Sequence, residues 1–193
     1  MRRIVVLFIF LALLTAGCTA QVPLGFSLAD PQVSQVHNQG AILVLQDAEH
    51  AFTQSFTTPN SGLNSLTFWA SVPADSDRQG LLHAALFAGG DAVPFHSASF
   101  SAQGIQQNSP VRLNFEPRAG PPGQTYTLKL TAEGGVFEIH GRSEDIYGGG
   151  MAALDGIPLN ADLAFETTYA YTSTALKQDL NRAAGWARLA LPR

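Results

Sequence analysis

Apolar and polar residues alternate with a period of two along much of this chain, and no other feature constrains its fold as strongly. The clearest alternations occupy residues 66–70, 111–115, 125–131 and 163–171, and less regular apolar runs occupy residues 42–45, 52–56, 81–88, 93–100 and 136–140. Successive side chains of a strand point to opposite faces, so an alternating run predicts a strand with one face in a core and the other in water. The pattern predicts about nine or ten strands.

Clusters of glycine, proline, asparagine, aspartate and serine separate these runs. They lie at residues 59–62, 74–77, 89–91, 120–123, 134–135 and 148–150. Glycine allows a positive φ and proline fixes φ, so such clusters end strands and form turns. Many short strands without helical periodicity between them predict one all-β domain, a sandwich or a barrel, over residues 39–171.

The N-terminus has the layout of a secretory signal. Arg2 and Arg3 precede a run of 13 residues at positions 4–16 that is apolar except for Thr15, and small residues lead up to Cys18. A helix that spans a membrane needs about 20 apolar residues, so this run is short for a permanent anchor. We therefore expect residues 1–17 to be a cleaved signal peptide.

The stretch Leu14-Thr15-Ala16-Gly17-Cys18 resembles the lipobox of bacterial lipoproteins, with Thr15 where that family usually has leucine. The resemblance implies that Cys18 is diacylated, begins the mature protein and anchors it in membrane lipid on the extracytoplasmic face of a bacterial membrane. Two acyl chains make such an anchor stable. The alternative is an ordinary signal peptide cut near Ala20, with Cys18 discarded.

The charge balance and the cysteine count exclude several classes of partner. Eleven basic and fifteen acidic residues give a net charge of −4, which becomes −6 when Arg2 and Arg3 leave with the signal. A nucleic-acid backbone needs a dense positive surface, so we expect no nucleic-acid partner. Cys18 is the only cysteine, which excludes an intrachain disulfide and a cysteine-based zinc site.

Two segments flank the region of strands. Residues 18–38 are polar and contain Pro23 and Pro31, which predicts a lipidated tether. Residues 172–193 change to a helical period, with Leu176, Leu180 and Leu191 on one stripe. The alternatives for this short amphipathic helix are a helix packed on the sandwich, a frayed tail and a helix that binds a partner.

Six stretches carry a resemblance to a fold family: Gln54-Ser55-Phe56 and residues 63–68, 80–87, 111–117, 123–130 and 162–169. Their order looks like a bacterial jelly-roll β-sandwich of the galactose-binding-like or carbohydrate-binding-module type. The resemblance implies an antiparallel jelly roll and a non-catalytic accessory domain, often glycan-binding and sometimes purely architectural. Folds of this kind host many functions, so the function has to be argued from a site.

No catalytic constellation is visible in the sequence. The five histidines lack the spacing that places two imidazoles on one face, and the nucleophile-elbow, dinucleotide and phosphate-loop motifs are absent. Glu144 and Asp145 are neighbours, and neighbours on a strand point to opposite faces, so they cannot flank one glycosidic bond. We expect a protein that is not an enzyme and has no organic cofactor.

A structural calcium ion is the one metal that the resemblance implies, held between the first and last strands by carboxylates and backbone carbonyls. Asp47, Glu49 and Asp162 lie near the ends of such strands and are the candidate ligands. The alternative for Asp162 is a turn cap before the last strand.

Exposed aromatic rings are the other candidates, because the apolar face of a sugar stacks on a ring while its hydroxyls take polar partners. Trp69 alternates out of phase with the apolar residues of its strand, and Tyr147 lies beside three glycines. A slot of Trp69, Arg112, Asn114 and Tyr147 is the predicted ligand surface. Both aromatic residues could instead cover a second apolar layer.

These observations leave three hypotheses for the function. The first is a membrane-anchored lipoprotein whose jelly roll binds a glycan or another component of the cell envelope. The second is an accessory subunit of a membrane complex, in which the sandwich and the C-terminal helix contact protein. The third, a glycan-processing enzyme, lacks catalytic residues.

Overall fold

The computed structural model describes residues 28–29, 38, 40–76 and 78–170. The predicted signal peptide, Cys18, nearly all of the predicted tether and the C-terminal helix predicted at residues 172–193 lie outside these residues. The described residues contain thirteen strands and one 3₁₀ turn, η3 (Ala102–Gly104), and none of their helices is long and apolar enough to cross a membrane. The prediction of an all-β fold is confirmed.

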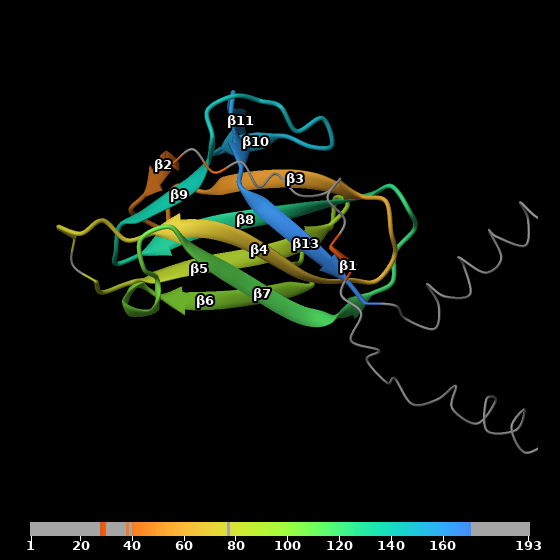
Figure 1. The fold of residues 1–193 in the computed structure, drawn as a ribbon, viewed down its shortest axis with the longest axis horizontal. Helices are drawn as coiled ribbons and strands as arrows, with labels where there is room; N and C mark the ends of the chain where they lie inside the picture. Colours follow the sequence, from red (N-terminus) through yellow and green to blue (C-terminus); the bar gives the residue numbers. More distant parts are fainter. Residues whose placement is uncertain (1–27, 30–37, 39, 77, 171–193) are drawn as a thin grey trace, which may run out of the picture.

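The strands form two antiparallel sheets, drawn in Figure 1. Sheet A contains β1 (Leu28–Ala29), β2 (Gly40–Leu45), β4 (Leu63–Ser71), β7 (Ser109–Arg118), β9 (Phe137–Arg142), β12 (Asp162–Leu163) and β13 (Phe165–Tyr169). Sheet B contains β3 (Phe52–Thr58), β5 (Leu81–Ala88), β6 (His96–Ser101), β8 (Gln124–Glu133), β10 (Ala152–Leu154) and β11 (Ile157–Pro158). The architecture is a β-sandwich.

The order of strands decides which residues become neighbours. In sheet B the order is β11-β10-β3-β8-β5-β6, so β6 forms one edge. In sheet A the long strand β4 pairs with β13, with β9 and with β7, and β7 forms an edge. β6 and β7 are therefore the edge strands on one side of the sandwich, and they contact each other across the gap between the sheets.

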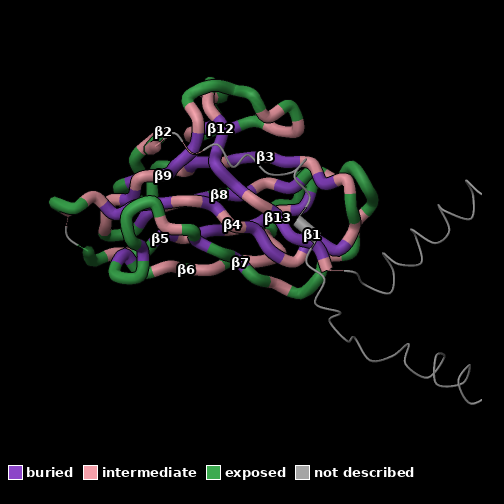
Figure 2. Tube along the Cα trace, viewed as in Figure 1, coloured by how far each residue is buried: buried purple, intermediate pink, exposed green. Residues whose placement is uncertain are grey.

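The core lies between the two sheets and follows the alternation in the sequence. Along β3 buried and half-buried residues strictly alternate, and Figure 2 shows buried segments along the strands of both sheets. Phe56 of sheet B joins the layers, because its ring lies 5.4 Å from that of Phe165 in sheet A and 5.7 Å from that of Tyr126. Burying each such ring contributes about 2 kcal/mol.

Three local features differ from the predicted pattern. Residues 163–171 were expected to form one strand, but β12 and β13 are separated at Ala164, whose N–H donates to the carbonyl of His140. The short strands β10 and β11 were not predicted. Leu28 and Ala29, from the predicted tether, pair with β13 as β1.

Candidate functional site

Three of the four predicted ligand residues lie on the outer face of sheet A. Thr67 of β4 is opposite Arg112 of β7, Ser65 is opposite Asn114, and Trp69 is opposite Pro110. The residues between them face the core, so Trp69 and these partners point away from it. Arg112 and Asn114 are exposed and Trp69 is half-buried.

Arg112 is held in place on this face by a hydroxyl group. Its Nη2 donates to Oγ of the buried Ser65 over 3.1 Å. The Ser65 hydroxyl also bonds the hydroxyl of Thr168 on β13, which donates to Oδ1 of Asn64 over 2.8 Å. The outer face of sheet A thus carries an ordered row of polar groups beside one indole ring.

Tyr147, the fourth predicted ligand residue, does not join this face. It lies in the loop between β9 and β10, and its ring meets Phe165 edge to face, with 5.2 Å between the ring centroids. Burial raises the pKa of its hydroxyl. The packing alternative that the sequence left open for Tyr147 matches this placement.

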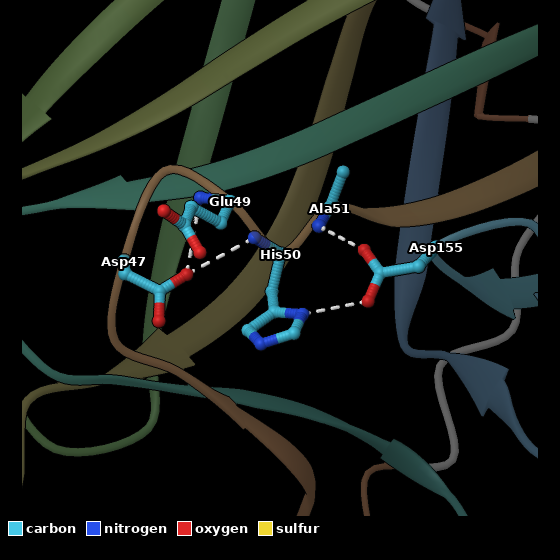
Figure 3. A network of polar contacts seen from close by, with 5 residues as sticks. All are labelled: Asp47, Glu49, His50, Ala51 and Asp155. Carbon is cyan, nitrogen blue, oxygen red and sulfur yellow. Dashed lines mark hydrogen bonds and ion pairs between the residues drawn. The ribbon is translucent and has the colours of Figure 1, made fainter.

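Asp47 and Glu49, two of the three predicted calcium ligands, lie in the loop from β2 to β3 (Figure 3). Oδ1 of Asp47 accepts from the backbone N–H groups of Glu49 and His50, over 3.1 and 3.0 Å. The carboxylate of Asp155 bonds His50 Nδ1 over 2.6 Å and the N–H of Ala51 over 2.8 Å. Asp47 thus orders the loop itself, and Asp155 fastens the loop to the β10–β11 turn.

Asp162, the third predicted calcium ligand, is fully buried in β12. Its Oδ2 accepts from the backbone N–H groups of Ile146 and Tyr147, both over 2.7 Å, while its Oδ1 has no hydrogen-bond partner. Burial raises the pKa of this carboxyl. In the part of the chain that the structure describes, no three His, Cys, Asp or Glu side chains are grouped to hold a metal ion.

A groove of about 760 Å³ opens where the edge strands β6 and β7 face each other. Its lining consists of Phe95, His96, Phe115, Glu116, Pro117, Arg118 and Ala119. None of these residues belongs to the predicted slot, although Phe115 to Arg118 follow Asn114 directly on β7. The groove combines aromatic rings with one acidic and one basic side chain, the composition typical of a small-ligand site.

Contacts among the rings give this groove a fixed shape. Phe115 packs edge to face with Phe95, with 5.4 Å between the centroids, and lies 5.2 Å from the ring of His96. The guanidinium of Arg118 lies 4.5 Å from the centroid of Phe95, a cation–π contact that orients its N–H groups. Glu116 is exposed beside it.

The sequence pattern did not distinguish these residues from the core. Phe115 is in phase with Val111 and Leu113, which are buried, so alternation predicts that it too is buried. It remains half-exposed because it lies near the end of an edge strand, where only Phe95 and His96 pack against its ring among the aromatic contacts of the described residues. The signal in the sequence that could have indicated the groove was the aromatic Phe115 close to the charged Glu116 and Arg118.

His83 forms a separate polar cluster on the outer face of sheet B. Its Nδ1 bonds Ser99 Oγ over 2.7 Å and its Nε2 bonds Glu133 over 2.9 Å. Ser99 lies directly opposite His83, and Glu133 lies one diagonal away on β8. Such cross-strand neighbours contact each other on any antiparallel sheet, so we interpret the cluster as surface pairing.

A scan against protein-family models found no match for this chain, and a search of the curated proteins found none either.

Proposed function

We propose that this protein is a membrane-anchored lipoprotein of the bacterial cell envelope whose jelly-roll domain binds a glycan in the groove between β6 and β7. The groove is the observation that carries the proposal. It is large enough for one or two sugar units, at about 760 Å³, and it lies where the start of β6 faces the end of β7.

The side chains of the groove suit the two faces of a sugar. The half-exposed rings of His96 and Phe115 offer surfaces on which the apolar C–H face of a pyranose stacks. Arg118 supplies hydrogen-bond donors and Glu116 supplies acceptors, so hydroxyl groups on the ring's edge find both. The chemistry is that of binding, because the groove holds a single carboxylate where glycoside hydrolysis needs two.

Two arginines of one strand allow a matched test. Arg118 lies in the groove and Arg112 lies on the outer face of sheet A beside Trp69. We expect glycan-array binding by the wild-type chain, a loss of affinity of about tenfold or more in Arg118→Ala, and an unchanged affinity in Arg112→Ala.

If Arg112→Ala weakens binding and Arg118→Ala does not, the site lies on the outer face of sheet A, and Trp69→Ala should then abolish binding. An empty array together with partner proteins that copurify in stoichiometric amounts would contradict glycan binding and favour the role of an accessory subunit. Circular dichroism of each variant checks that the sandwich is intact.

A further inference from the structure

The edge strands of the described sandwich differ in their protection against pairing with another strand. Native edges are protected by short length, proline, charge or an irregularity in the strand. In sheet A, β7 carries Pro110, Pro117 and two arginines, β1 has two residues, and the register of β2 shifts between Ala41 and Leu43. In sheet B, β11 has two residues, one of them a proline.

β6 has none of these protections. It is six residues long, His-Ser-Ala-Ser-Phe-Ser, with no proline and no Asp, Glu, Lys or Arg, and its register with β5 is continuous. Within the described ranges no strand pairs with its outer side. A neutral, regular edge of this length is a template for one more strand.

The ladder with β5 fixes which backbone groups of β6 are free. The N–H of Ala102 donates to the carbonyl of Gly80 over 3.0 Å, and Ser101 is opposite Leu81. Bonded and non-bonded pairs alternate along an antiparallel ladder. The N–H and C=O groups of Ser97, Ser99 and Ser101 therefore point away from β5, along the open edge.

The sequence of this edge is complementary to itself. If two copies of β6 run antiparallel with Ser99 opposite Ser99, then Ser97 is opposite Ser101, and Ala98 is opposite Phe100. Serine meets serine on the outer face, and a small residue meets a large one on the inner face. Like charges opposite each other would disfavour self-pairing, and this register places none opposite each other.

We propose that β6 pairs with β6 of a second copy of this chain, so that the two B sheets form one continuous sheet about a twofold axis through Ser99. The N–H of each Ser99 donates to the Ser99 carbonyl of the other copy. Such an isologous contact closes as a dimer and leaves no open edge on this side of sheet B.

The side chains of β6 fit this arrangement. The hydroxyl of Ser99 already bonds His83 within its own copy, over 2.7 Å, so the new contact has to satisfy only the backbone. Ala98 and Phe100 are half-buried, and the ring of Phe100 lies edge to face with Phe68 of the core, 6.4 Å away. A second copy covers these two side chains.

Cysteine cross-linking tests the register directly. In the full chain carrying Cys18→Ser, an introduced cysteine is the only one, because Cys18 is the only natural cysteine. Opposed residues of a bonded pair have Cα atoms about 5.5 Å apart, within the range of a disulfide. We expect Ser99→Cys to form a disulfide-linked dimer on mild oxidation, and Ser97→Cys to stay monomeric because its partner is Ser101.

A mixture of the Ser97→Cys and Ser101→Cys chains should then cross-link between unlike copies. Equal cross-linking of Ser99→Cys and Ser97→Cys would overturn the register, and no cross-linking of either Ser99→Cys or the mixture would overturn the dimer. This experiment does not depend on the glycan groove, so its outcome is separate from that of the proposed function.

Sedimentation of the full chain in detergent gives a second measurement, the protein mass. We expect twice the monomer mass that mass spectrometry gives for the same purified protein, and a dimer dissociation constant that Ser99→Pro raises by roughly tenfold or more, because each copy loses the N–H that bonds its partner. This N–H does not bond β5, so the sandwich tolerates the change. Ser99→Ala keeps the N–H and should keep the dimer. A monomer at all concentrations, or a dimer that Ser99→Pro leaves unchanged, would overturn the proposal.

Discussion

Asp162 is the residue with the least ordinary environment in the described sandwich. It is fully buried, two backbone N–H groups bond one carboxylate oxygen, and the other oxygen has no partner. Those N–H groups belong to Ile146 and Tyr147, so this carboxyl fixes the start of the glycine-rich loop, whose far end is bonded to β3 through Thr57 and Ser55. The two N–H groups need a hydrogen-bond acceptor at this position, but a negative charge is costly there because the position is buried.

Replacing Asp162 with asparagine separates these two roles. The amide keeps an oxygen for both N–H groups and removes the buried charge, but its NH₂ group replaces an oxygen that has no partner, so Asp162→Asn should change the free energy of unfolding at pH 7 by less than about 1 kcal/mol. Asp162→Ala should lower it by about 2 kcal/mol or more, because both N–H groups lose their partner. Urea unfolding of the three proteins measures the differences.

The pH dependence provides the check on this interpretation. Burial raises the pKa of Asp162 above 3.8, so the folded state binds the proton more tightly than the unfolded state. The stability that Asp162 contributes is then greatest below pH 3.8 and is lost as the pH rises through the raised pKa. Asp162→Asn should remove this slope, and an unchanged slope would contradict the assignment.

His50 and Asp155 form an exposed pair whose two pKa values move in opposite directions. The bond to Asp155 raises the pKa of His50 above 6.5, and the N–H of Ala51 together with His50 lowers the pKa of Asp155 below 3.8. Asp155 has φ 53°, a conformation that asparagine tolerates well. Asp155→Asn should therefore lower the His50 midpoint in an NMR titration without disturbing the turn.

Glu49→Gln is the control for this titration, because Glu49 contributes least to the raised pKa of His50. It should move the midpoint far less than Asp155→Asn does. The contribution of His50 to stability is full below pH 6.5 and is lost as the pH rises through its raised pKa, whereas that of Asp155 is lost as the pH falls through its lowered pKa. Equal shifts in the two variants would show that Asp155 is not the main partner.

The strands show which elements a sequence can specify locally. β5 occupies the predicted residues 81–88, because this short apolar run is bounded by Gly80 and Gly89. β10 and β11 were not predicted because they have three and two residues and exist through pairing with β3 and with each other. The groove was not predicted for the same reason, because it depends on how distant strands pair. Phe115 is half-exposed since β7 is an edge strand, which is a property of the sheet and not of the local sequence.

The turn between β4 and β5 contains an element-scale constraint at Gly80. Its φ is +112°, and an added Cβ would lie 2.6 Å from the backbone nitrogen of Gly135. Gly80→Ala should therefore lower the free energy of unfolding by about 2 kcal/mol or more. Gly90→Ala is the matched control, because nothing lies within 4 Å of its added Cβ, and it should leave the thermal midpoint within a degree or two. Similar thermal midpoints for Gly80→Ala and Gly90→Ala would contradict the close approach of Gly80 to Gly135.

At the scale of the whole molecule, the two proposed contacts lie on the same side of the sandwich and use different groups. The groove takes its ligand through side chains of the β6–β7 gap, and the dimer uses the outward backbone of β6. A dimer places two grooves on one particle, and two linked weak sites bind a repeating ligand more tightly than one. A polymeric glycan at an envelope surface is a ligand of that kind.

Membrane anchoring is the last prediction at this scale, and the sequence around Cys18 carries it. If Cys18 is diacylated, the full chain expressed in a bacterial host should sediment with membranes, and its intact mass should be that of residues 18–193 plus a diacylglyceryl group, because two acyl chains hold a domain stably on a bilayer. Cys18→Ser should release the protein or leave it unprocessed, while the neighbouring change Thr19→Ser should leave both the mass shift and the membrane fraction in place. If the signal is instead cut near Ala20, wild type and Cys18→Ser have the same soluble product, so identical masses for the two proteins would reject the anchor.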